Sequence, residues 1–294
     1  MRLYYSPAYV LAAHSFDTTR KAGWIADSLL ADPIKGVQLI EPIALTEEDL
    51  LAAHGPAYVA AVRDGEPRDL AESNGFAWDF GLWDMVRASN GGAVRAALDA
   101  LADGGVAGSL SSGLHHAKRN RGDGFCTFNG VALGARAALA AGAGSVLIID
   151  LDAHCGGGTF EILGDEPKVR QVDLAVSSFD HYSGNDRMRL DLIRDASLYL
   201  ATLHRRLSEL DDHPFDLVIY NAGMDPFEGC AVGGMPGMRH ELLAAREAAV
   251  FNWCRARAVP TAFVMAGGYT GANLSRDALV ALHRLTIAAA AGPA

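Results

Sequence analysis

The sequence predicts a single α/β domain, spanning residues 1–294, with a central and mostly parallel β-sheet flanked by helices. Short β-branched runs alternate along the chain with longer stretches of helical periodicity, which is typical of this class. Three of the runs, at 146–149, 216–220 and 261–265, are almost entirely apolar, as strands buried on both faces of a parallel sheet are. No proline-rich or serine-rich linker divides the chain, and its apolar half is ample for one sizeable core.

Each element is predicted from a local pattern. Thr46 opens a helix, because Glu48 and Asp49 stand in its first turn, where carboxylates suit the helix dipole. Residues 66–79 show no periodicity and predict a long loop, which in compact domains often forms a binding rim. In chain order we expect a strand at 2–5, a helix at 21–30, a strand at 36–40, a helix from 46, helices at 82–101 and 131–141, a strand at 146–149, a helix from 159, a strand at 169–176, a helix at 198–210, a strand at 216–220, a helix at 238–256, a strand at 261–265 and a last helix before a frayed tail at 288–294.

Composition excludes several classes of protein. The formal net charge of −10 opposes nucleic-acid binding, whose affinity comes mainly from Lys and Arg on phosphates. The first residues lack a basic region followed by an apolar run, and no apolar stretch reaches the roughly 18 residues of a membrane span, so we expect a cytoplasmic protein without a membrane partner. The four cysteines, too sparse for a disulfide scaffold, are expected to be reduced thiols: Cys126, Cys155, Cys230 and Cys254.

Possible metal ligands follow two of the apolar strands. Asp150, Asp152 and His154 come at alternate positions after 146–149, where an extended backbone would direct all three side chains to one side. Asp225 follows the strand at 216–220 and either joins the same site or forms a turn before a proline. Two carboxylates and one imidazole suit zinc and leave a coordination position open for water and substrate.

Proton-transfer groups lie in two glycine-flanked loops. His115 and His116 form a tandem pair after Gly113, and they either serve as general base and acid beside a metal-activated water or make hydrogen bonds within the loop. Tyr269 follows two glycines at the end of the third apolar strand. Its hydroxyl would stabilise an oxyanion, unless the ring is simply a packed aromatic.

Taken together, these segments resemble the zinc-dependent histone deacetylase and acetylpolyamine amidohydrolase family of the arginase/deacetylase superfamily. They occur in the order of that family and cover nearly the whole chain. The matching segments are Thr46-Glu-Glu-Asp-Leu with His54-Gly-Pro-Ala-Tyr58, Gly113-Leu-His-His-Ala, Gly124-Phe-Cys, Asp150-Leu-Asp-Ala-His, Ala222-Gly-Met-Asp225 and Gly267-Gly-Tyr269.

The resemblance implies a role for each of these residues. It implies one Zn²⁺ per chain, with Asp150 orienting His115 and Tyr269 polarising the substrate carbonyl. It also implies a structural potassium ion beneath the zinc. The implied zinc ligands are Asp152, His154 and Asp225, the implied potassium position is near Asp150, Asp152, His154, Ser177 and Ser178, and the implied substrate-binding residues are Gly124, Phe125, Phe179 and Tyr182.

The sequence departs from the family pattern in two places. Cys155, Gly156 and Gly157 stand where the family usually has His, Gly and then Asp or Asn, so the group that normally supports the second tandem histidine is missing. Either His116 stays neutral and acts mainly as a base, or another group substitutes. The loop after Ser177 also differs, since Phe179 stands where the family generally has His.

These features predict an amidohydrolase that removes an acyl group, acetyl in the first place, from an amine. Acetyl-lysine, an acetylpolyamine and a small acetamide all remain open as substrates, as does the oligomeric state. One alternative is an arginase-type ureohydrolase with two manganese ions, although Gly156 stands where its motif requires a second Asp. The other is a catalytically silent homologue that binds an acylated ligand, a hypothesis prompted by the loss at Gly157.

Overall fold

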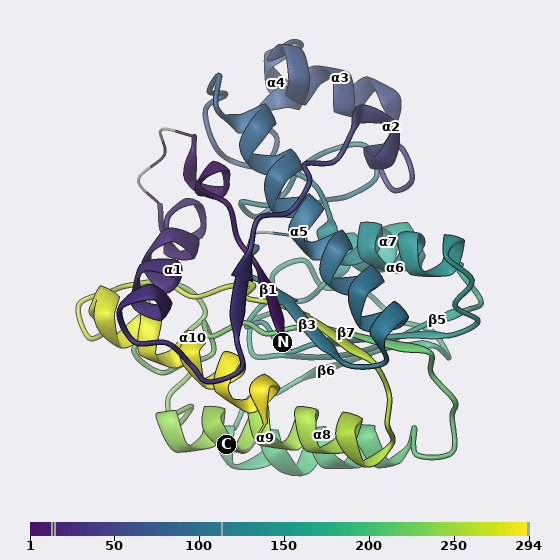
Figure 1. The fold of residues 1–294 in the computed structure, drawn as a ribbon, viewed down its shortest axis with the longest axis vertical. Coiled ribbons are helices and arrows are strands. Elements are labelled where there is room, and N and C mark those ends of the chain that lie inside the picture. The colour runs from purple at the N-terminus through teal and green to yellow at the C-terminus, as the bar shows by residue number, and fades with distance from the viewer. Residues whose placement is uncertain (13, 15, 113, 293–294) are drawn as a thin grey trace.

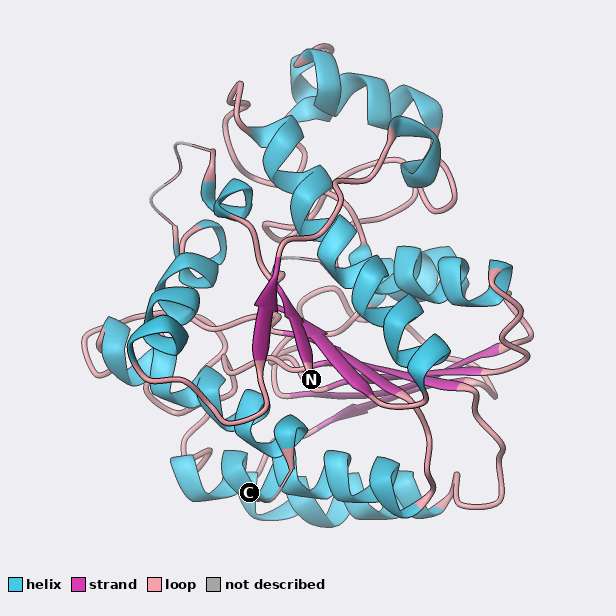
Figure 2. Cartoon of the chain, viewed as in Figure 1, coloured by secondary structure: helices cyan, strands magenta, loops and turns pink. Residues whose placement is uncertain are grey.

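Eight parallel strands form one sheet in the order β2-β1-β3-β8-β7-β4-β5-β6. Figures 1 and 2 show it in a computed structural model of the chain, which describes residues 1–12, 14, 16–112 and 114–292. Each neighbouring pair of strands is parallel, which confirms the predicted fold class. The strands are β1 (Arg2–Tyr4), β2 (Gln38–Ile40), β3 (Val106–Ser109), β4 (Val146–Asp150), β5 (Val169–Ala175), β6 (Met188–Leu192), β7 (Leu217–Asn221) and β8 (Thr261–Val264).

Helices cover both faces of the sheet (Figure 1). Among the described residues, 3₁₀ turns lie at Pro7–Val10, Asp17–Thr19 and Ala196–Leu198. One face carries α1 (Lys21–Ala31), α8 (Tyr199–Ser208), α9 (His240–Ala256) and α10 (Arg276–Ala291). The other carries α5 (Leu82–Asp103), α6 (Gly130–Ala140) and α7 (Gly157–Leu163), with α2 (Glu47–Leu50), α3 (Pro56–Asp64) and α4 (Arg68–Ala71) beyond α5. None of the helices in the described residues is both long and apolar enough to cross a membrane.

The β4 strand shows why its sequence is apolar throughout. Leu147 and Ile149 pack into the core beneath α8 and α9, whereas Val146 and Ile148 pack into the core beneath α5 and α6. Since successive side chains of a strand point to opposite faces, a strand with a helical layer on each side needs apolar residues at every position. The strand order places β8, β7 and β4 side by side near the centre of the sheet. Because these strands are parallel, their carboxyl ends lie next to one another.

The structure differs from the sequence predictions at several elements. The strands β3 and β6 were not predicted. The β3 strand carries small residues that give a weak strand signal. The β6 strand lies at the edge of the sheet, and its alternation of apolar and polar residues is a strand pattern that the sequence prediction missed. The loop predicted at 66–79 contains α4, and the tail expected to fray from 288 continues as helix α10 to Ala291. Gly113 and residues 293–294 lie outside the described residues. All four cysteines are free and buried.

Gly108 is one of the small residues that make β3 difficult to predict as a strand, and its packing predicts how a substitution there changes the stability of the protein. A Cβ atom at this position would overlap the ring of Phe263 on the neighbouring strand β8. We expect Gly108→Ala to lower the free energy of unfolding by about 1–3 kcal/mol, the usual cost of overpacking a core. Urea denaturation followed by circular dichroism measures this change.

Gly105→Ala is the matched control, because a Cβ atom there meets nothing within 4 Å. It should leave stability unchanged or raise it slightly, since alanine restricts the unfolded chain. Equal effects of the two substitutions would contradict this account of β3.

Candidate active site

Three side chains converge where β4 and β7 end. The possible ligand atoms of Asp152, His154 and Asp225 all lie within 4.8 Å of one another, and all three residues are buried. His154 Nδ1 is 3.1 Å from Asp152 Oδ1 and 3.2 Å from Asp225 Oδ2. The structure thus brings together the three residues that the sequence predicts as metal ligands.

The backbone reaches this arrangement by bending rather than by continuing the strand. β4 ends at Asp150, and residues 151–154 form a bend. The Asp152 amide donates to Asp150 Oδ1 at 3.2 Å, and the His154 amide donates to Asp152 Oδ1 at 3.0 Å. The expectation of three side chains alternating from an extended strand is therefore wrong, because each carboxylate turns the chain by accepting the amide two residues on.

Backbone amides from neighbouring strands orient the two carboxylates. The Gly267 amide, beyond β8, donates to Asp152 Oδ2 at 2.7 Å, and the Ala153 amide donates to Asp225 Oδ1 at 2.9 Å. Asp225 Oδ2 is buried and, although it lies 3.2 Å from His154 Nδ1, it accepts no hydrogen bond from the residues that the structure describes. One imidazole and two oriented carboxylates, one of which has an unpaired buried oxygen, fit a three-ligand zinc centre with an open position.

Burial and nearby charges shift the pKa values of two of these residues. Burial and the nearby Asp152 carboxylate raise the pKa of Asp225 to about 6. Burial opposes a charge on His154, but the Asp152 and Asp225 carboxylates outweigh that effect and raise its pKa to about 10. The shift of His154 indicates that the two carboxylates attract a positive charge.

His115 is held by the carboxylate predicted for it. Asp150 Oδ2 lies 2.9 Å from His115 Nδ1, while Asp150 Oδ1 accepts from the Asn221 side chain at 2.8 Å. Burial opposes the imidazolium, but the Asp150 and Asp152 carboxylates outweigh it and raise the pKa of His115 to about 10. His115 therefore carries a positive charge beside the three converging residues.

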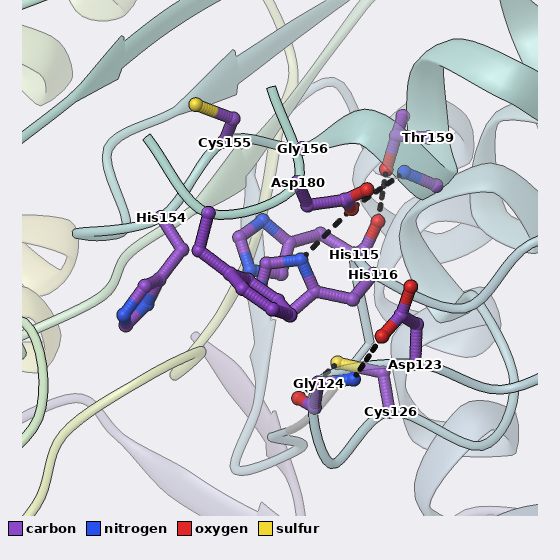
Figure 3. Close-up of polar contacts among 12 residues, drawn as sticks. His115, His116, Asp123, Gly124, Cys126, His154, Cys155, Gly156, Thr159 and Asp180 are labelled. Carbon is purple, nitrogen blue, oxygen red and sulfur yellow. Dashed lines mark hydrogen bonds and ion pairs between the residues drawn. The ribbon is translucent and has the colours of Figure 1, made fainter. Parts of the chain in front are cut away.

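Another group substitutes for the missing support of His116, one of the two alternatives that the sequence left open. Its Nδ1 atom lies 3.0 Å from Asp180 Oδ2, a contact drawn in Figure 3. Asp180 belongs to the loop after β5, and sequence reasoning missed it because only the spatial contact relates it to the histidine. Burial and the charge on His115 lower the pKa of His116 to about 4, so this imidazole is neutral near pH 7.

A cavity of about 350 Å³ opens above these residues. Phe179, with 45% of its surface exposed, forms part of the wall. Tyr182 was expected there, but its ring is buried against Phe160. Its hydroxyl accepts from the Gln171 side chain at 2.8 Å and donates to Asp173 Oδ2 at 3.1 Å, and these contacts hold it away from the cavity. The lining includes Gly124, Phe125, Phe179, His116, His154 and Tyr269.

Comparison with known proteins agrees with this geometry. Residues 14–285 match the model of the histone deacetylase domain. The chain belongs to the histone deacetylase family. It is 33% identical over 243 residues to an uncharacterized protein of Picosynechococcus sp., and the match covers 80% of each chain. It is 28% identical over 290 residues to histone deacetylase 2 of Arabidopsis thaliana, and this match covers 92% of this chain and 74% of that one.

The fold is shared with a solved structure. The crystal structure of the HDA15 HD domain superposes with a TM-score of 0.84 over 100% of this chain and 91% of that one, at 20% identity. The two proteins therefore have the same fold.

Lys21 is a further residue of this deacetylase site that the sequence did not reveal. It lies on α1, fully buried, and its ammonium donates to the Ala266 carbonyl and lies 3.4 Å from the Gly268 carbonyl. Burial lowers its pKa to about 8, although nearby carboxylates oppose this shift. These contacts hold the loop that carries Tyr269, whose own pKa is raised well above its usual value by burial and by Asp225, so the phenol keeps its proton.

We expect Lys21→Met to loosen that loop. The substitution removes the donor of the buried Gly268 carbonyl, whereas the Ala266 carbonyl keeps a second donor, Ser112 Oγ at 2.7 Å. A buried carbonyl that stays unsatisfied costs about 1–3 kcal/mol. Hydrogen exchange of residues 266–270 should become at least tenfold faster. Lys35→Met, at an exposed lysine, is the control, and unchanged exchange in Lys21→Met would contradict the role of this contact.

Proposed function

We propose that the chain is a zinc-dependent amidohydrolase that removes an acyl group, acetyl in the first place, from an amine. One observation carries this proposal: Asp152, His154 and Asp225 converge beneath a cavity that His116 and Tyr269 also line. Zinc bound to the three ligands would polarise the substrate carbonyl and make water a nucleophile near neutral pH.

Three side chains of the protein would transfer the protons and stabilise the developing charge. His116, neutral and facing the cavity, accepts the proton of the attacking water and delivers a proton to the departing amine. His115, charged and held by Asp150, supplies a fixed positive charge beside the reacting atoms. Tyr269, protonated and lining the same cavity, donates a hydrogen bond to the developing oxyanion.

The shape of the cavity supports an acylated amine as the substrate. Phe125 and Phe179 give it apolar walls for an aliphatic stem, and Gly124 keeps it open, because a Cβ atom there would contact Phe179 and His116. Acetyl-lysine, an acetylpolyamine and a small acetamide all present such a stem.

The two alternative functions have less support. The silent-homologue hypothesis rested on a missing carboxylate, and Asp180 now supplies one at His116. A ureohydrolase with two manganese ions needs a second bridging acid, and Gly156 occupies that position of the motif. We therefore retain zinc-dependent deacylation.

The structural potassium ion remains a prediction. The resemblance implies a position near the backbone around Asp150, Asp152, His154, Ser177 and Ser178, so the exposure of the Ser178 side chain does not argue against it. Asp173 pairs in register with Asp150, and its buried Oδ1 atom has no hydrogen-bond partner among the residues that the structure describes. If a monovalent cation binds beneath the site, Asp173 would be a further ligand.

Hydrolysis of a panel of acetylated amines by the zinc-loaded protein tests the proposed function. We expect turnover that falls by about 10²–10³ in Tyr269→Phe, the usual effect of removing one oxyanion donor, and that is lost in His115→Ala. Tyr5→Phe, outside the cavity, is the control. Absence of hydrolysis across the panel by fully loaded protein would falsify the proposal.

Zinc binding is testable without a substrate. Metal analysis should find one zinc per chain, whereas two manganese ions would favour the ureohydrolase alternative. Zinc should raise the melting temperature of the apoprotein, because a ligand that binds only the folded state stabilises it. Asp225→Asn should abolish most of this shift, and Asp165→Asn, at an exposed carboxylate, should retain it.

A further inference from the structure

We propose that Asp180 is the positioning residue for His116, and that its carboxylate takes over from the missing group at Gly157. The inference rests on the proposed function, in which His116 transfers protons. It assigns a reaction role to a loop residue that no sequence motif identifies.

The contacts of Asp180 fix its carboxylate on both oxygens. Oδ2 accepts from the Gly158 amide at 3.0 Å and lies 3.0 Å from His116 Nδ1. Oδ1 lies 3.0 Å from the ammonium of Lys118, and the side chain is only 5% exposed. Figure 3 shows the carboxylate of Asp180 directed at the His116 ring.

This hydrogen bond selects the tautomer of His116. A carboxylate can only accept, so the proton of the neutral imidazole lies on Nδ1. The lone pair then lies on Nε2, the atom that is free to take a proton from water. A histidine without this partner would populate both tautomers and rotate more freely, so Asp180 keeps the base ready for proton transfer.

Gly157 has no side chain and therefore leaves room for Asp180. A Cβ atom at position 157 would lie 2.5 Å from Asp180 Oδ1 and still closer to its backbone oxygen. A side chain at 157 and the observed place of Asp180 therefore exclude each other. Asp180 also has a φ of 57°, a left-handed conformation that aspartate tolerates better than most residues.

With Asp180 in this role, the group that holds His116 comes from the cavity wall and not from helix α7. Phe179, the residue before Asp180, packs edge-on against the His116 ring with a centroid distance of 5.0 Å. One loop thus supplies an apolar wall for the substrate and the hydrogen bond that orients the base. Loss of that hydrogen bond should affect turnover more than substrate binding.

Steady-state kinetics of the zinc-loaded full chain test this inference. We expect Asp180→Ala to lower kcat about 10–100-fold, the range seen when a carboxylate behind a catalytic or metal-bound histidine is removed, with KM changed less than threefold. Zinc content should stay at one per chain. Asp186→Asn, at a fully exposed carboxylate in the same loop, should retain the wild-type kcat.

Two further variants separate positioning from folding. Lys118→Met removes one anchor of Asp180 and should lower kcat by a smaller factor. Gly157→Ala should reproduce the kcat loss, because its Cβ displaces Asp180. In the NMR spectrum, the Nδ1 proton of His116 should give a slowly exchanging downfield resonance that disappears in Asp180→Ala while the other resonances persist.

The outcomes distinguish the inference from the function on which it rests. Hydrolysis by the wild-type protein together with an unchanged kcat in Asp180→Ala overturns the inference alone. A kcat loss accompanied by loss of zinc or a general change of the NMR spectrum also overturns it, because the role is then structural. A zinc-loaded wild-type protein without hydrolysis overturns both.

Discussion

Two carboxylates buried at the centre of a parallel sheet are the constraint on which this structure depends. Asp152 and Asp225 are nearly inaccessible to solvent, and like charges so close together in a protein interior are costly unless a cation joins them. Their surroundings are organised accordingly, with backbone amides fixing one oxygen of each and His154 between them. On the far side, the buried guanidinium of Arg246 donates to the Leu151 carbonyl at 3.0 Å and so supports the bend that presents these ligands.

The tandem histidines show how two identical side chains come to differ. His115 lies beside Asp150 and Asp152 and is charged. His116 is hydrogen-bonded to Asp180, lies near Asp152 and is next to the charge on His115. Their rings are 3.9 Å apart, so protonating one disfavours protonating the other. The surroundings of the two rings therefore separate a charged imidazole from a neutral one, as in other sites where paired titratable groups differ in protonation state.

The relocation from Gly157 to Asp180 limits what a motif can reveal about activity. By its sequence motif alone, the chain has lost a supporting group, which prompted the hypothesis of a catalytically silent homologue. In space, a carboxylate still meets His116, and the glycine is what makes its approach possible. The chemistry requires a hydrogen-bond acceptor at one point, and the fold can deliver that acceptor from more than one segment.

The sequence by itself determined the fold class, the zinc-ligand candidates, the histidine pair and Tyr269, because each of these depends on residues adjacent along the chain. An apolar run encodes a strand with both faces buried, and polar residues directly after it must lie at the sheet's carboxyl edge. The tertiary structure alone decided that Asp180 meets His116, that Lys21 holds the Tyr269 loop, that Tyr182 turns away from the cavity and that Ser178 is exposed. Those outcomes depend on which distant segments pack together, and no pattern of neighbouring residues along the chain identifies such contacts.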